Sequence, residues 1–291
     1  MKYIEKNPII MIIIGVIGIS LSSIFVKYSA APSAVTAAYR LIWTVLLLSP
    51  AVWGKREVRK ELLSAGKKTF LLSSLSGVFL AVHFVLWFES LSHTSVASST
   101  TIVCTEVVWV ALGFAVFLKG KISRKAILAM GIALFGSVLI ACADAGGETH
   151  LYGDVLALLA AIAVAAYMLL GRIVRKNTST TVYTYVVYVS CAVALVIMCA
   201  ISKVSLFAYG YSAPVVGLLL SVFSTILGHS IFSWCLKFFT PSFVSASKLC
   251  EPVVAAVLAG VLFGEIPSLL QLAGGVLVLG GVYYYSRIEK E

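Results

Sequence analysis

Charged residues are scarce in this sequence, and acidic ones are the scarcest. Only 12% of the 291 residues are charged and 60% are hydrophobic, whereas soluble domains carry roughly 25% charged residues. This excludes an ordinary water-soluble domain and indicates an integral membrane protein. The 12 acidic and 22 basic residues give a net charge of +10, so the distribution of the basic residues decides whether nucleic acid is a plausible partner.

Motifs of catalysis and metal binding are also missing. The six cysteines include no CxxC pair, so the sequence supports neither a disulfide framework nor a zinc site. The sequence has no P-loop, no HExxH and no GxSxG motif, and therefore indicates neither direct use of ATP nor a hydrolase. We expect no enzyme activity, no metal and no cofactor.

What the sequence does contain is a series of apolar stretches, each about long enough to cross a bilayer as a helix, for which about 20 residues are needed. The first exceeds the 7–15 apolar residues typical of a secretion signal, so we interpret it as a transmembrane helix. The longest connection, 54–68, is rich in Lys and Arg and is a candidate for a short surface helix. We predict an all-α protein with ten transmembrane helices at 8–30, 34–53, 69–91, 95–118, 124–143, 151–173, 180–202, 214–237, 242–264 and 268–286.

The basic residues gather in alternate connections. Eighteen of them lie at the termini and loops of one side, and only Lys203 lies on the other. Because cytoplasmic loops are enriched in Lys and Arg, we predict cytoplasmic termini in a multi-pass protein of the cytoplasmic membrane. This alternation also accounts for the net charge without nucleic acid. The expected partners are a small-molecule substrate and the lipid bilayer, and the expected assembly is a monomer or weak homodimer.

The two halves of the chain resemble each other. Residues 117–136 align with residues 261–280 at an offset of 144, and glycines and histidines coincide as well as leucines, which argues against chance similarity. Each half has five spans, an odd number, so the second half would enter the membrane in the opposite sense. Inverted repeats with a midplane site are typical of secondary transporters. We predict two five-helix repeats, 8–143 and 150–286.

Four segments carry a resemblance to a known family: SSIFVKYS, AAYRLIW, HFVLWFESLSHTSVASST and EPVVAAVLAGVLFGEIPSLLQLAGGVLVLGG. They resemble the EamA-like family of the drug/metabolite transporter superfamily, over nearly the whole chain. Pro252-Val253, Gly264-Glu265 and Gly274-Gly275 match the family's second half, whereas the first half departs from it, with Glu106 in place of the proline and Lys121 in place of the glutamate. The resemblance implies a central cavity built largely by spans one, three, four, six, eight and nine, and transport of small organic metabolites, often by export.

The ninth predicted span carries two charges and a proline. Pro252 removes the donor that would bind the carbonyl of Lys248, so a polar group or a neighbouring helix must replace it. Lys248 and Glu251 are three residues apart and share a face, and Lys248 either pairs or extends its ammonium toward water. Gly260 and Gly264 form a GxxxG motif that permits close helix crossing.

Three charged residues inside spans are candidates for a site. Glu106 and Glu251 lie near the middle of the fourth and ninth spans, where a carboxylate suits proton carriage or recognition of a substrate cation. Arg40 lies roughly 9 Å deep at about 1.5 Å per residue and could bind a substrate carboxylate through two parallel hydrogen bonds. The alternative is structural pairing, of Glu251 with Lys248 or Arg40 and of Glu106 with Arg40.

Two deep histidines are related by the repeat. His83 and Trp87 share a face of the third span with two serines, and His229 and Ser233 continue a polar stripe along the eighth. Hydrogen bonding between helices is the alternative to lining a cavity, and for the tryptophans packing is the alternative. The predicted cavity residues are His83, Trp87, Glu106, His229, Ser233, Glu251 and Arg40.

These observations predict a secondary transporter of small organic metabolites such as amino acids, with export as the expected direction. It would work by alternating access around a midplane cavity, with or without coupling to protons. The alternative is a flippase for a lipid or a lipid-linked carrier, which would need a lateral opening toward the bilayer.

Overall fold

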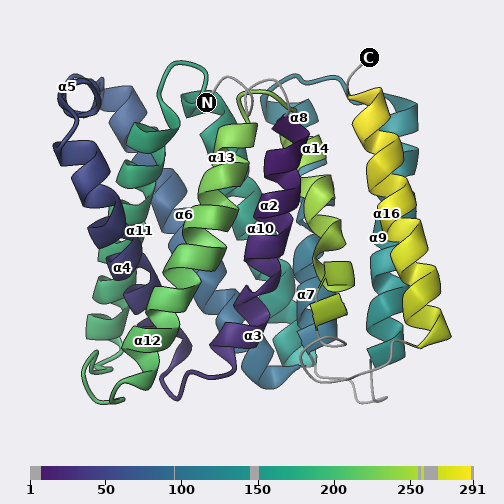
Figure 1. Cartoon of the computed structure of the whole chain (residues 1–291), viewed down its shortest axis with the longest axis horizontal. Helices are drawn as coiled ribbons and strands as arrows, with labels where there is room; N and C mark the ends of the chain where they lie inside the picture. Colours follow the sequence, from purple (N-terminus) through teal and green to yellow (C-terminus); the bar gives the residue numbers. More distant parts are fainter. Residues whose placement is uncertain (1–7, 95, 145–150, 255–256, 259–267, 290–291) are drawn as a thin grey trace.

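The computed structural model describes residues 8–94, 96–144, 151–254, 257–258 and 268–289, and this part of the chain is a bundle of helices without a strand (Figure 1). The first half contains α2 (Pro8–Ser20), α3 (Ser22–Val26), α4 (Ser33–Trp53), α5 (Arg56–Leu63), α6 (Lys67–His93), α7 (Val96–Cys104), α8 (Glu106–Phe117) and α9 (Arg124–Asp144). The second contains α10 (Leu151–Val174), α11 (Thr180–Ile201), α12 (Ser212–Leu219), the π-helix η1 (Leu220–Ser230), α13 (Ile231–Cys235), α14 (Pro241–Ser247), the 3₁₀ turn η2 (Lys248–Cys250) and α16 (Leu269–Ile288).

Within the described residues, eight stretches are long and apolar enough to cross a membrane. They are Pro8–Val26, Ser33–Trp53, Lys67–His93, Ser98–Phe117, Leu151–Val174, Thr180–Ile201, Ser212–Cys235 and Leu269–Ile288. The prediction of an all-helical, multi-pass membrane protein is confirmed. The fifth predicted span is the helix α9, but it is not among these eight, and much of the ninth, with Gly260 and Gly264, lies outside the described residues. The number of ten transmembrane helices stays a prediction.

One end of the bundle carries the basic connections. The first turn of α2 and the last turn of α16 lie together at this end (Figure 1). The predicted surface helix in 54–68 is confirmed as α5, which lies at the same end and is seen nearly end-on, so its axis runs across those of α4 and α11. The assignment of this end to the cytoplasm remains a prediction from the charges.

Helices α9 and α16 run side by side at one edge of the bundle (Figure 1). A Cβ added to Gly136 would lie 2.6 Å from the carbonyl oxygen of Gly274, and a Cβ on Gly274 would lie 2.6 Å from that of Gly136. Gly281 is similarly close to Ala133. Gly280, which the repeat pairs with Gly136, faces open space. In the pairs Gly274-Gly275 and Gly280-Gly281, only Gly274 and Gly281 therefore allow the close approach to α9.

Two further glycines bring helices of the two halves together. A Cβ on Gly77 of α6 would lie 2.4 Å from the carbonyl oxygen of Val187 in α11, and one on Gly18 of α2 would lie 2.6 Å from that of Phe223 in η1. Because these contacts are with backbone, the helices could not stay at this distance with a larger residue. The cavity helices α2 and α6 are thus held against the second half at close range.

We predict that Gly136→Val and Gly274→Val each lower the free energy of unfolding by about 1–3 kcal/mol, the usual cost of overpacking. The valine would force α9 and α16 apart. The measurement is thermal unfolding of the purified protein in detergent. Gly280→Ala is the control and should leave stability unchanged or raise it by up to about 1 kcal/mol, because alanine is the better helix former. Equal losses in all three variants would contradict this packing.

Candidate functional site

The fourth span is broken at its middle, and the break places Glu106. Helix α7 ends at Cys104 and α8 begins at Glu106. Between them, Thr105 donates both its backbone N–H, at 3.0 Å, and its hydroxyl, at 2.6 Å, to the carbonyl oxygen of Ile102. Because Thr105 satisfies this carbonyl locally, the helix can break there without a proline. Glu106 is then buried in the first turn of α8.

The ninth span is broken at the equivalent place. After α14, the turn η2 has 3₁₀ geometry, and the N–H of Glu251 bonds the carbonyl oxygen of Lys248 three residues back. The Cys104 thiol from α7 also points to that oxygen, at 3.9 Å. The prediction that another group would replace the donor lost at Pro252 is confirmed. In this part of the repeat the offset is 146, which relates Cys104 to Cys250 and Ile102 to Lys248. The carbonyls that accept the hydrogen bonds at the two breaks, those of Ile102 and Lys248, are therefore equivalent.

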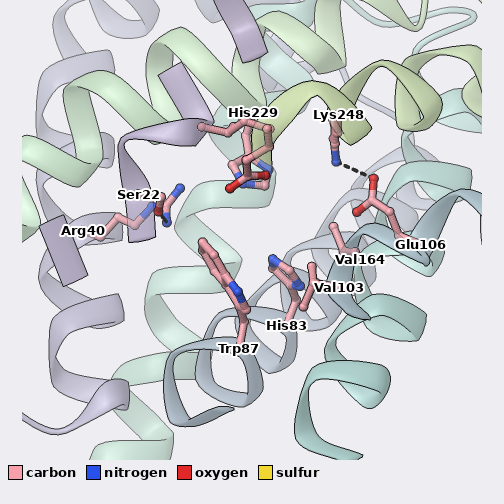
Figure 2. Close-up of a pocket in the computed structure, with 11 residues that line it drawn as sticks. Ser22, Arg40, His83, Trp87, Val103, Glu106, Val164, His229 and Lys248 are labelled. Atoms are coloured by element: carbon pink, nitrogen blue, oxygen red, sulfur yellow. Dashed lines mark hydrogen bonds and ion pairs between the residues drawn. The ribbon is translucent and has the colours of Figure 1, made fainter. Parts of the chain in front are cut away.

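A buried ion pair joins these two breaks. The Lys248 ammonium lies 2.8 Å from Glu106 Oε1 (Figure 2). Lys248 is only 6% exposed, and its other neighbours are the sulfur of Met168, at 3.5 Å, and the ring of Phe232, at 5.4 Å. The pairing of Lys248 is thus confirmed and its extension toward water is wrong. The alternative pairing of Glu106 with Arg40 is also wrong, because Lys248 takes that place.

Arg40 is buried without a carboxylate partner among the described residues. Its Nε donates to the Thr225 hydroxyl at 2.7 Å and its Nη1 to the Ser22 hydroxyl at 3.2 Å. The guanidinium carbon lies 4.1 Å from the centre of the Phe84 ring. Its Nη2 has no hydrogen-bond partner. The predicted pairing of Arg40 with a glutamate is therefore wrong, and one donor of a buried cation stays available.

Glu251, like Arg40, is a buried charged group that lines the cavity and has no ionic partner among the described residues. It is 8% exposed, and its Oε1 has no hydrogen-bond partner. The expected pairing with Lys248 or Arg40 does not occur, because Lys248 binds Glu106 and Arg40 binds hydroxyls. An unsatisfied buried polar atom costs about 1–3 kcal/mol, and more when it is charged. Arg40 Nη2 and Glu251 Oε1 therefore both favour a ligand or water.

The two repeat-related histidines lie together. Their ring centres are 6.4 Å apart, His83 stacks on Trp87 with centres 5.9 Å apart, and His229 meets the edge of Phe84 at 5.3 Å. His83 Nδ1 lies 3.0 Å from the carbonyl oxygen of Ala160, so this nitrogen carries the proton and donates it. Nδ1 of His83 therefore forms a hydrogen bond between helices, which was the alternative to lining a cavity. The His83 ring nevertheless lies next to the ring of His229.

The π-helix η1 positions His229 and the hydroxyls beside Arg40. In this wide helix the Thr225 hydroxyl reaches the carbonyl oxygen of Leu220, five residues back, at 3.3 Å. The hydroxyls of Ser221 and Thr225 both point toward α4, where they meet Thr44, at 2.9 Å, and Arg40. π-helical turns occur frequently at functional sites. The predicted polar stripe of the eighth span therefore exists, and it holds Arg40 in place.

These groups line one cavity of about 40 Å³. A buried water needs roughly 10–15 Å³ measured in this way, so the cavity has room for a few waters. Figure 2 shows Arg40 and Ser22 on the opposite side from the Glu106–Lys248 pair, with His83 and Trp87 between them in this view. Trp87 Nε1 has no hydrogen-bond partner. The lining residues are Ile19, Ser22, Arg40, His83, Trp87, Val103, Glu106, Val164, His229, Lys248 and Glu251.

Six of the seven predicted cavity residues therefore lie around one space, and Ser233 does not. The Ser233 hydroxyl pairs with that of Tyr167 at 2.8 Å. The sequence prediction left Lys248 out of the site, although its spacing of three from Glu251 was a signal for it. It also missed Ser22, which no pattern in the first span singled out. Among the described residues no group of three His, Cys, Asp or Glu could hold a metal ion.

Trp43 and Trp234 do not line the cavity. Trp43 donates from Nε1 to the carbonyl oxygen of Pro214 at 3.0 Å. Trp234 packs on Phe238 with ring centres 4.4 Å apart. Trp234 is five positions after His229, whereas Trp87 is four positions after His83. In an α-helix, side chains four positions apart share a face and those five positions apart do not. The extra residue explains why only Trp87 lines the cavity.

A family model described as "EamA-like transporter family" matches the chain twice, over residues 6–142 and 151–287. Similar proteins include bacterial ones whose names call them transporters or exporters. The uncharacterized transporter YxxF of Bacillus subtilis is 26% identical over 95% of this chain and 87% of its own length. The uncharacterized transporter YdfC of the same organism is also 26% identical, over 67% of this chain and 64% of its own length.

The third relative has a named cargo. It is the pseudopaline exporter CntI of Pseudomonas aeruginosa, which is 23% identical over 74% of both chains. A solved structure titled only "Crystal structure of protein" superposes with a TM-score of 0.79 over 98% of both chains at 15% identity. At this identity the superposition shows the shared fold alone.

We predict that Lys248→Met lowers the free energy of unfolding by about 3–5 kcal/mol, because it leaves the Glu106 carboxylate buried without its partner. The double variant Glu106→Gln with Lys248→Met should recover most of this loss, since no charge is then stranded. Thermal unfolding in detergent measures both. Glu57→Gln, at an exposed carboxylate, is the control. A double variant as unstable as Lys248→Met alone would show that the pair is not what stabilises this region.

Proposed function

We propose, on the premise that this chain belongs to the EamA-like transporter family, that it is a secondary transporter of small organic metabolites such as amino acids. It lies in the cytoplasmic membrane with both termini in the cytoplasm, and it exports its substrate. The repeats 8–143 and 150–286 rock against each other around the cavity and expose it to each side in turn. The name of the CntI relative, an exporter, supports the direction.

The observation that carries the substrate class is a pair of unsatisfied, oppositely charged groups in one cavity. Arg40 presents Nη2 and Glu251 presents Oε1, both buried and both without a hydrogen-bond partner. A solute with an anionic and a cationic end satisfies both at once. Its carboxylate would bind Arg40, with Trp87 Nε1 as a further donor, and its ammonium would bind Glu251. Charge-assisted hydrogen bonds of this kind are roughly twice as strong as neutral ones.

The lining of the cavity supports the transport cycle. Arg40, His83 and Glu106 come from the first half, whereas His229, Lys248 and Glu251 come from the second. The cavity has room for only a few waters, so the halves must separate before a larger substrate enters. Arg40 lies in the first half and Glu251 in the second. A movement of one half against the other therefore changes the distance between the two groups that would hold the substrate.

Glu251 is the proposed proton carrier, and Glu106 is not. Lys248 already neutralises Glu106 at 2.8 Å, whereas the free Oε1 of Glu251 can accept a proton or a substrate ammonium. Because one carboxylate cannot bind both at once, proton and substrate would exclude each other. This is the behaviour required of an exporter that exchanges an outgoing substrate for an incoming proton.

We predict that a zwitterionic amino acid raises the unfolding temperature of the purified protein, whereas its methyl ester and its N-acetyl derivative do not. A ligand at 100 times its Kd adds about 2.7 kcal/mol to stability. A panel of amino acids in a thermal-shift assay identifies the best ligand. Arg40→Lys and Glu251→Gln should each weaken its binding by at least tenfold, while Ser233→Ala, outside the cavity, should not. Equal binding of the ester or the N-acetyl derivative would refute the zwitterion site.

We predict that uptake into proteoliposomes depends on pH in the wild type and in the double variant Glu106→Gln with Lys248→Met, in which no charge is stranded, but not in Glu251→Gln. Only the Glu251 carboxylate exchanges a proton for the substrate. The measurement is radiolabelled substrate uptake at several internal and external pH values. If both variants leave the flux and its pH profile unchanged, the coupling fails. Fluorescent-lipid scrambling by the same proteoliposomes would support the flippase alternative instead.

A further inference from the structure

The surface helix α5 carries a cluster of three cations that the transport site does not use. Arg56, Arg59 and Lys60 are exposed and stand at positions i, i+3 and i+4, which are neighbours on a helix surface. No ion pair of these side chains occurs among the described residues. Like charges at this spacing repel, and a cation in the first turn also opposes the helix dipole. A bound anion would relieve both effects.

The opposite side of α5 is fixed to the bundle. Val58 and Leu62 are half-buried, and Glu61 accepts the backbone N–H of Ser179, the residue that caps α11, at 2.7 Å. The carboxylate of Glu61 is thus occupied on the inner side. At about 100° per residue, Arg56, Arg59 and Lys60 lie opposite these three residues. The bundle itself therefore holds the cationic face outward.

Apolar side chains accompany the cations. Leu63 is 72% exposed and shares the face of Arg56, Arg59 and Lys60, while Trp53, at the end of α4, is 47% exposed. The indole Nε1 of Trp53 donates to the Tyr185 hydroxyl at 3.0 Å, which fixes the ring beside α5. Tryptophan is enriched where a bilayer meets water. A free phosphate ion would make no apolar contact with Leu63 and Trp53, whereas the acyl chains of a phospholipid would pack against them.

We propose that α5 is a binding surface for anionic phospholipids of the leaflet at this end of the bundle. The phosphate lies among Arg56, Arg59 and Lys60, and Leu63 and Trp53 contact the acyl chains. Clusters of basic residues next to a membrane-spanning helix are the form that recognition of anionic headgroups takes. Because α5 lies between α4 and α6 and is tied to α11, a bound lipid stabilises the end of the bundle that the cavity helix α6 shares.

The test uses the full-length protein in an uncharged detergent with added phosphatidylglycerol or phosphatidylcholine. We expect phosphatidylglycerol to raise the unfolding temperature more than phosphatidylcholine does, and native mass spectrometry to show it retained. Neutralising Arg56, Arg59 and Lys60 together to Gln should weaken phosphatidylglycerol binding on the order of 100-fold, since each cation near an anionic surface contributes about a factor of five. Inorganic phosphate at the same concentration should have no effect.

The matched control neutralises three exposed cations at the same end, Lys121, Arg124 and Lys125, to Gln. Phosphatidylglycerol binding should survive in this variant. Leu63→Gln separates the two parts of the site and should weaken lipid binding while the cations remain. An equal loss in both triple variants, or equal stabilisation by the two lipids, would overturn the proposal, because a general surface charge would then explain the binding. None of these outcomes depends on the transport proposal.

Discussion

The structure depends on how four charged side chains are held inside an apolar bundle. A buried charge must be paired or hydrogen-bonded, because water is not present to solvate it. Lys248 and Glu106 meet this demand with one ion pair between the two halves. Arg40 meets it with two hydroxyls and an aromatic face, and Glu251 meets it least. The cavity exists where the bundle leaves these demands unmet.

The two helix breaks explain how the charges reach the cavity. A continuous helix would direct its side chains by rotation alone, whereas a break frees a backbone carbonyl and redirects the residues after it. In the second half Pro252 enforces the break and the Cys104 thiol contributes to satisfying the freed carbonyl. In the first half Thr105 satisfies it with its own hydroxyl. Two different local chemistries therefore produce the same geometry, and the first half breaks its helix without a proline.

The two glutamates differ in their partners, because Glu106 pairs with Lys248, whereas Glu251 belongs to the proposed zwitterion site. Glu106 is occupied by a cation of the protein itself, so it contributes to holding the halves together. Glu251, one turn away from Lys248, is left for an external cation or proton.

The helices and most of the polar residues that line the cavity could be predicted from the sequence, although Ser22 and Lys248 were missed and Ser233 does not line it. In hydrocarbon a charge or an imidazole has few tolerable places, so Arg40, His83, Glu106, His229 and Glu251 could be assigned to a cavity from their depth and spacing alone. The pairing of these side chains across helices became known only from the packed bundle. Glu106 pairs with Lys248 rather than with Arg40, and Ser233 bonds to Tyr167. Contacts between helices depend on how each helix is rotated and how closely the helices cross. The spacing of residues along one helix carries no information about either.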